Sequence, residues 1–186
     1  MRSKSKSLVL LSGGIDSYVA LALEKRRGSD CSSLSFRYDG QSLLEVKAIQ
    51  EISKRENVPN YMIKHPKIIG KMYAGKPVQF SPDNLLYYSI AICFARNNNL
   101  SRIVGGQNKD DLIHAPDADA IFYRSLNGVL EESYSNIDIK IIQPLLNMTK
   151  MEVVKKAQEK GIVFQNLNIK RFLEEKKENK NKNGLK

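Results

Sequence analysis

The sequence predicts an α/β fold built on a doubly wound, five-stranded parallel sheet. Five short apolar segments alternate along the 186-residue chain with longer segments whose apolar residues recur at helical spacing. The first short segment, residues 7–11, is almost wholly apolar, as expected for a parallel strand that is buried on both faces. Because right-handed crossovers place helices against a parallel sheet, this alternation implies helices on both of its faces.

Four further elements follow in the first half of the chain. We expect a helix over residues 16–26, a strand over 32–38, a helix over 43–57 and a brief strand over 60–63. In the second strand Leu34 and Phe36 alternate with polar residues, and Asn57 ends the second helix shortly before Pro59. Residues 64–80 contain glycines and prolines without a clear period, so we interpret them as a long functional loop.

The second half continues the same alternation. We expect a helix over residues 85–97, a strand over 102–106, a helix over 117–132, a strand over 138–142 and a helix over 149–160. Ser81 and Pro82 are the expected N-cap and first residue of the third helix. Cys93 lies among apolar neighbours in that helix and is expected in the core. Residues 1–166 are thus predicted to form a single domain.

Charge is concentrated at the two ends of the chain. The formal net charge is +10, but residues 7–169 hold only +3 of it. Residues 167–186 form a basic tail that is poor in apolar residues and expected to be mobile. Nucleic acid is therefore a possible partner that the charge distribution does not favour. The sequence shows neither a membrane-spanning apolar run nor a signal peptide, which predicts a cytoplasmic protein with no membrane association.

The segment with the clearest chemistry lies between the first strand and the first helix and reads Ser-Gly-Gly-Ile-Asp-Ser over residues 12–17. Glycines let the backbone approach an anion closely, and a helix start presents unpaired N–H groups with a positive dipole. Ser12 and Ser17 add hydroxyl groups that could reach phosphate oxygens. Asp16 suits such a site if Mg²⁺ lies between its carboxylate and the phosphates.

A purely structural interpretation of this segment is a glycine turn with Asp16 at a helix start. Its position directly after the first buried strand favours ligand binding instead, because parallel sheets bind ligands at the carboxyl ends of their strands. The resemblance of this segment to the pyrophosphate loop of PP-loop ATP pyrophosphatases implies that a nucleotide is bound by Leu11, Ser12, Gly13, Gly14, Ile15, Asp16, Ser17, Tyr38 and Gln41.

This segment resembles the pyrophosphate loop of the PP-loop ATP pyrophosphatase superfamily. The resemblance implies the adenine-nucleotide alpha-hydrolase-like (PP-loop) fold. It also implies cleavage of ATP between its α and β phosphates, which leaves an adenylated substrate that a nucleophile such as ammonia then attacks. The released pyrophosphate would be held by Ser12, Gly13, Gly14, Asp16 and Ser17.

Within that superfamily, residues 8–164 are most similar to the 7-cyano-7-deazaguanine synthase family of the queuosine and archaeosine precursor pathway. The similar blocks, in chain order, are residues 12–17, residues 36–41 with Glu45, residues 83–86, residues 106–117 and residues 143–152. The resemblance implies Asn84, Asp111 and Asp117 on the substrate side. It also places Lys150 with Ser12, Asp16 and Ser17 as catalytic residues.

Each of these residues also has a structural interpretation that the sequence leaves open. Thr149 and Glu152 have the spacing of a capping box, which would explain both without a ligand. Asn84 lies where helix capping competes with ligand contact, and exposed loop carboxylates such as Asp111 are often only solvated.

The chain departs from the family pattern on the acceptor side. The family's four-cysteine zinc cluster has no counterpart, since Cys31 and Cys93 are the cysteines present. The family's histidine after Gly-Gln is Ser42, and the arginine before its helix-start asparagine is Asp83. The family's Ser-Gly-Tyr-Pro-Asp-Cys loop reads Ile-His-Ala-Pro-Asp-Ala over residues 113–118. We therefore expect ATP and Mg²⁺ as cofactors and no zinc site.

The leading hypothesis is an ATP-dependent carbon–nitrogen ligase that adenylates 7-carboxy-7-deazaguanine and uses ammonia to form 7-cyano-7-deazaguanine through the amide. One alternative keeps the adenylation but directs it to tRNA or to another carboxylate. Another is a nucleotide-binding module that lacks catalysis. A homodimer is compatible with each hypothesis.

Overall fold

The computed structural model describes residues 4–38, 41–65, 69–71, 77–79, 84–113, 116–134 and 138–164. Its main sheet has the strand order β3-β2-β1-β6-β7. These strands are β1 (Lys6–Leu10), β2 (Asp30–Tyr38), β3 (Asn60–His65), β6 (Arg102–Val104) and β7 (Lys140–Ile142). Every pairing between them is parallel, which confirms the predicted five-stranded parallel sheet.

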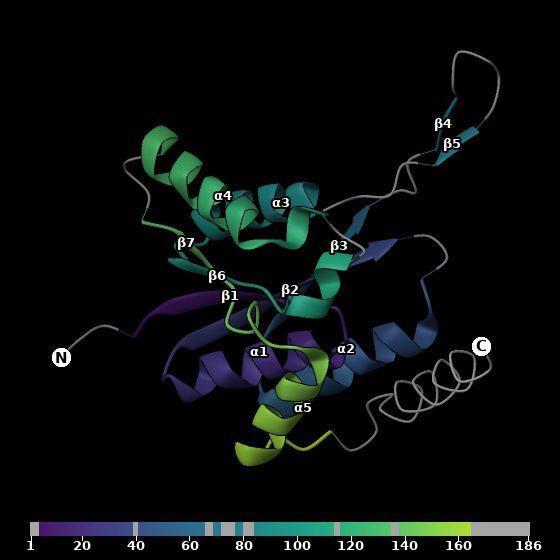
Figure 1. Ribbon diagram of the computed structural model, residues 1–186, viewed down its shortest axis with the longest axis vertical. Coiled ribbons are helices and arrows are strands. Elements are labelled where there is room, and N and C mark those ends of the chain that lie inside the picture. Colours follow the sequence, from purple (N-terminus) through teal and green to yellow (C-terminus); the bar gives the residue numbers. More distant parts are fainter. Residues whose placement is uncertain are drawn as a thin grey trace, which may run out of the picture.

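Helices cover both faces of the sheet, as Figure 1 shows. One face carries α1 (Ile15–Arg26), α2 (Leu43–Glu56) and α5 (Lys150–Glu159), and the other carries α3 (Asn84–Asn97) and α4 (Ala120–Ser133). Successive residues of a strand point to opposite faces, so Leu8 packs into the core under α3 and α4 while Val9 packs into the core under α1, α2 and α5. Both side chains are 0% exposed, and burial of each stabilises the fold by about 1.5–3 kcal/mol. The predicted double winding is therefore confirmed.

Local sequence determines where several helices begin and end. The Ser42 hydroxyl accepts a hydrogen bond from the Leu44 N–H at 3.2 Å at the start of α2, and Asn57 ends that helix in the left-handed region. The capping box at the start of α5 is present, with Thr149 and Glu152 bonded to each other's backbone N–H groups.

The fourth helix begins later than the sequence predicts. Residues 116–118 form a short 3-10 turn, η2 (Pro116–Ala118), where the sequence predicted the start of an α-helix. Asp119 then caps α4, because its Oδ1 accepts a hydrogen bond from the Phe122 N–H at 2.6 Å.

Four other expectations differ from the structure or fall outside the described residues. The segment 64–80 is not a simple loop, because β4 (Ile69–Lys71) and β5 (Pro77–Gln79) form an antiparallel hairpin. Cys93 is exposed, since α3 buries the stripe formed by Tyr88, Ala91 and Ala95 and Cys93 lies on another side of the helix. The expected cap at residues 81–82 and the tail at residues 167–186 lie outside the described residues.

The strand order creates a crevice beside β1. The chain passes from β1 to β2 on one side and later returns to β6 on the other side of β1. The connections after β1 and β6 therefore diverge at the carboxyl ends of these strands, which is where open α/β sheets bind ligands. None of the described helices is long and apolar enough to cross a membrane.

Candidate active site

A cavity of about 790 Å³ lies at the carboxyl ends of the central strands. This volume falls within the range of small-molecule sites, about 300–1,000 Å³. Nearly all of the predicted site residues line it, namely Leu11, Ser12, Gly13, Gly14, Ile15, Asp16, Ser17, Tyr38, Gln41, Asn84, Asp111 and Lys150. Among the predicted residues, Asp117 does not line this cavity. The structure thus brings together residues from five separate blocks of the sequence.

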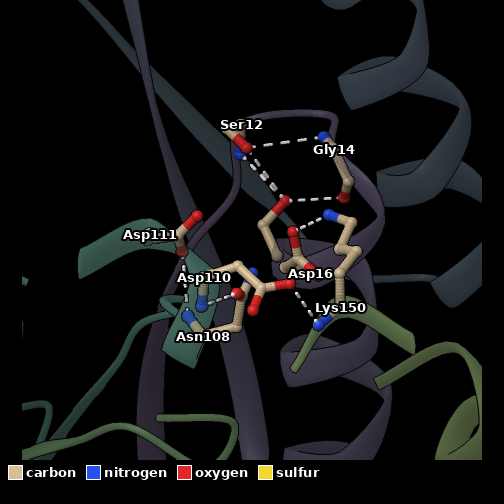
Figure 2. A network of polar contacts seen from close by, with 8 residues as sticks. Ser12, Gly14, Asp16, Asn108, Asp110, Asp111 and Lys150 are labelled. Carbon is tan, nitrogen blue, oxygen red and sulfur yellow. Dashed lines mark hydrogen bonds and ion pairs between the residues drawn. The ribbon is translucent and has the colours of Figure 1, made fainter. Parts of the chain in front are cut away.

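The glycine loop is held by its own serine side chains (Figure 2). The Ser17 hydroxyl donates to the Gly14 carbonyl at 2.9 Å and accepts from the Ser12 amide N–H at 3.2 Å. The hydroxyl oxygens of Ser12 and Ser17 are 3.1 Å apart. Ser17 is buried, whereas Ser12 is exposed at the cavity. The Ser17 side chain therefore shapes the loop, and the Ser12 side chain is the more accessible to a ligand.

Two glycines allow close backbone packing around this loop. Gly13 has a φ of +83°, and a β-carbon there would lie 2.9 Å from the Glu45 carbonyl oxygen of α2. A β-carbon at Gly106, just after β6, would lie 2.7 Å from the Ser17 nitrogen. The loop is thus fitted between α2 on one side and the end of β6 on the other.

The start of α1 is suited to an anion. Gly14 is the N-cap residue and provides no side-chain hydrogen bond to the first amides of the helix. These amides have no acceptor within the helix and lie at the positive end of its dipole. Gly14 and Ile15 line the cavity, and the Gly14 N–H donates to Ser12 Oγ over a long 3.4 Å, a bond that a phosphate oxygen could replace.

Asp16 and Lys150 form an ion pair across the site, although 134 residues separate them in the sequence. The backbone N–H of Lys150 also donates to Asp110 Oδ2 at 2.9 Å, as Figure 2 shows. This bond holds the start of α5 beside η1 (Lys109–Ile113). Burial raises the pKa of Asp16 above its ordinary value, and the hydrogen bond and charge of Lys150 oppose that rise. The pair therefore holds a carboxylate and an ammonium at the base of the cavity.

The Asp16 carboxylate fits the predicted magnesium role. Its Oδ2 is paired with Lys150, whereas its Oδ1 is buried and has no hydrogen-bond partner among the described residues. A carboxylate oxygen beside phosphate oxygens is a typical ligand of Mg²⁺. Within the described part of the chain, no group of three or more His, Cys, Asp or Glu side chains could hold a metal ion by itself.

Asn84 and Asp117 bind each other on the other side of the cavity. Asp117 Oδ2 accepts from the Asn84 backbone N–H at 2.7 Å, and the Asn84 amide nitrogen donates to Asp117 Oδ1 at 3.2 Å. Asp117 therefore caps the start of α3, and Asn84 lines the cavity. Asp111 also lines the cavity, and its Oδ2 accepts from the Asn108 N–H at 2.9 Å.

Sequence reasoning missed several polar residues of this site. Gln107 lines the cavity and donates to Asn84 Oδ1 at 3.1 Å, and Tyr87 also lines the cavity. Asp110 accepts a hydrogen bond from the backbone N–H of Lys150. A polar residue directly after the glycine pair of β6 could have indicated Gln107, because this position is at a strand's carboxyl end. The contact of Asp110 with Lys150 joins distant segments and has no signal in the local sequence.

The family model described as queuosine biosynthesis protein QueC matches residues 6–74 and 67–170. The chain belongs to this family. Curated relatives carry the name 7-cyano-7-deazaguanine synthase. Those of Clostridium botulinum (strain Loch Maree / Type A3) and Saccharophagus degradans are each 29% identical to the chain, and each match covers 87% of this chain and 81% of the relative.

Solved structures confirm the PP-loop, adenine-nucleotide alpha-hydrolase-like fold that the family implies. The NH3-dependent NAD synthetase of Campylobacter jejuni has a TM-score of 0.56 at 14% identity, over 90% of this chain and 69% of that one. The NMN synthetase of Francisella tularensis has a TM-score of 0.54 at 17% identity, over 89% of this chain and 65% of that one. At these identities, the similarity describes the fold alone.

Proposed function

We propose that this chain is an ATP-dependent ligase that converts 7-carboxy-7-deazaguanine and ammonia to 7-cyano-7-deazaguanine. Membership of the QueC family and the name shared by the curated relatives support this proposal. The observation that carries it is one cavity that joins an anion-binding helix start to the Asp16–Lys150 pair. That arrangement suits the binding of a nucleoside triphosphate beside a second, smaller molecule.

The proposed reaction has two activating steps. A carboxylate oxygen of the acceptor attacks the α-phosphorus of ATP, the bond between the α-phosphorus and the bridging oxygen breaks, and pyrophosphate leaves. Ammonia then attacks the acyl carbon, loses a proton and displaces AMP to form the amide. The amide oxygen then attacks the α-phosphorus of a second ATP, and a second pyrophosphate leaves. Loss of both protons from the nitrogen and of AMP from the carbon leaves the nitrile.

The residues of the cavity have distinct proposed roles in this reaction. The N–H groups of Gly14 and Ile15, with the Ser12 hydroxyl, would bind the phosphates that leave as pyrophosphate. Lys150 would place a positive charge where negative charge develops on the leaving group. Asp16 would hold Mg²⁺, which when bound neutralises charge on the phosphate oxygens.

The remaining lining residues divide between the two substrates according to the strand order. Tyr38 ends β2 and Gln41 follows it, so they are proposed to lie beside the adenosine. Asp111 follows β6, on the opposite side of β1, and Asn84 at the start of α3 bonds to Gln107, which also follows β6, so Asn84 and Asp111 are proposed to face the acceptor.

A direct test is incubation of the chain with ATP, Mg²⁺, ammonia and 7-carboxy-7-deazaguanine, followed by mass spectrometry. We expect the amide and the nitrile to form only when ATP is present, and Asp16→Ala to abolish both. Asp30→Ala is the matched control, because Asp30 is exposed at the amino end of β2, away from the cavity. Absence of both products with the unaltered chain would contradict the proposed function.

A further inference from the structure

A series of three polar side chains, two of them half-buried and one fully buried, lies on the β6 side of the cavity. It runs from Gln143, which follows β7, through Tyr88 of α3 to Gln107, which follows β6. Tyr88 is 0% exposed and otherwise lies in the apolar core under α3 and α4. Burial of a hydroxyl among apolar side chains is unfavourable unless its hydrogen bonds are made, so the partners of Tyr88 require an explanation.

The direction of these hydrogen bonds follows from the number of protons available. The Gln143 amide nitrogen donates to the Tyr88 hydroxyl, and this hydroxyl donates its single proton to Gln107 Oε1 at 3.0 Å. Burial raises the pKa of Tyr88, so the hydroxyl keeps that proton near neutral pH. With Oε1 held by Tyr88, the Gln107 amide nitrogen faces Asn84 Oδ1 at 3.1 Å. Rotation of the Gln107 amide would therefore break two hydrogen bonds.

The backbone leaves room for this series. A β-carbon at Gly105 would lie 1.9 Å from the Tyr88 hydroxyl, 2.4 Å from Gln107 Oε1 and 2.6 Å from the Gln143 amide nitrogen. All three polar atoms thus converge on the space that a side chain at Gly105 would fill. A glycine at this position is required for the arrangement.

The Gln107 amide nitrogen has one proton left for a ligand. It carries two protons, Asn84 takes one, and no other described residue accepts the second. Gln107 lines the cavity on the β6 side of β1, opposite the side of Tyr38 and Gln41. Under the proposed function, that is the side of the acceptor substrate.

We infer that Gln107 is a specificity-determining residue that donates a hydrogen bond to a carbonyl oxygen of the acceptor heterocycle. Tyr88 and Gln143 are positioning residues that keep its N–H, rather than its oxygen, directed at that carbonyl. The inference rests on the proposed function, because it takes the acceptor to bind on the β6 side of the cavity. An acceptor that presents an N–H group at this point would meet a second donor and be rejected.

The test measures the KM for ATP and the KM for 7-carboxy-7-deazaguanine separately. Gln107→Met retains the length of the side chain and removes the donor, so we expect the acceptor KM to rise about ten-fold while the ATP KM is unchanged. Tyr88→Phe releases the Gln107 amide, so we expect a rise of about three-fold in the acceptor KM alone. Since both variants act through one N–H, the double variant should be no worse than Gln107→Met.

Tyr18→Phe is the matched control. It also removes the hydroxyl of a buried tyrosine, which donates to Glu56 at 3.0 Å on the opposite face of the sheet, and should change neither KM. The inference would be overturned if Gln107→Met kept the acceptor KM within about two-fold of the unaltered value, or if it raised both KM values equally. Either result would leave the proposed function standing. No turnover by the unaltered chain would overturn both. If Tyr88→Phe does not fold, Gln107→Met decides the question.

Discussion

Replacement of Gly106 by alanine should displace the glycine loop, residues 12–17, while the main sheet stays folded. The new β-carbon would lie 2.7 Å from the Ser17 nitrogen and 2.8 Å from the Asp16 carbonyl carbon. Both are backbone atoms, so rotation of a side chain cannot relieve the contact. To increase 2.7 Å to the 3.4 Å of ordinary contact, the start of α1 must move from the end of β6 by about 0.7 Å.

A shift of this size affects both stability and activity. Overpacking of this kind lowers the free energy of unfolding by about 1–3 kcal/mol, and a misplacement of about 1 Å can lower the rate by about 100-fold. We therefore expect kcat/KM for pyrophosphate release to fall about 10- to 100-fold in Gly106→Ala.

The control for this variant is the same substitution at Gly128 in α4, where a β-carbon meets nothing within 4 Å. Gly128→Ala should raise stability by about 1 kcal/mol through helix propensity and leave activity unchanged. Urea unfolding and a pyrophosphate-release assay on both variants make the comparison. Equal kcat/KM for folded Gly106→Ala and Gly128→Ala would refute the reasoning.

Three further predictions concern pH, stability and salt. Burial raises the pKa of Asp16 above 3.8, and Lys150 opposes this rise. Lys150→Met should therefore raise that pKa further and move the acid limb of the pH profile of kcat/KM to higher pH. An acid limb that stays in place would argue against the pairing of Asp16 with Lys150. Burial of Glu24 opposes its ionisation, but hydrogen bonds from Arg102, Ser29 and Ser7 outweigh it and lower the pKa of Glu24. Arg102→Met should therefore lower the free energy of urea unfolding by about 3–5 kcal/mol at neutral pH. The loss should be smaller below pH 4.5, where Glu24 becomes protonated. An equal loss at neutral pH and below pH 4.5 would contradict this. Turnover of a free acceptor should change less than about three-fold between about 50 and 200 mM salt, whereas a fall of about 1,000-fold would indicate a tRNA acceptor.

The strands of the main sheet and the glycine loop can be predicted from the sequence because their signals are local. The apolar run that ends at Leu11 and the glycine pair after it are adjacent in the chain, and together they indicate a strand, a turn and a helix start. The capping box of Thr149 and Glu152 is similarly local, and the structure confirms it. The hairpin of β4 and β5 was missed because each strand has only three residues, too few to show a period.

The contacts that complete the site cannot be predicted in this way. Lys150 meets Asp16 across 134 residues, and Asp117 caps a helix that begins 33 residues earlier. Only the folded sheet brings these segments to one edge. The orientation of Gln107 likewise depends on Tyr88 and Gln143, which come from two other elements.

In the proposed function, the cavity beside the glycine loop adenylates a carboxylate. The most direct measurement uses 7-carboxy-7-deazaguanine labelled with ¹⁸O in its carboxylate, with mass spectrometry of the AMP released in single-turnover reactions. Attack of the carboxylate on the α-phosphorus would transfer one labelled oxygen to each AMP, and Asp16→Ala would release no labelled AMP. Label-free AMP, or label in pyrophosphate, from the unaltered chain would contradict the account.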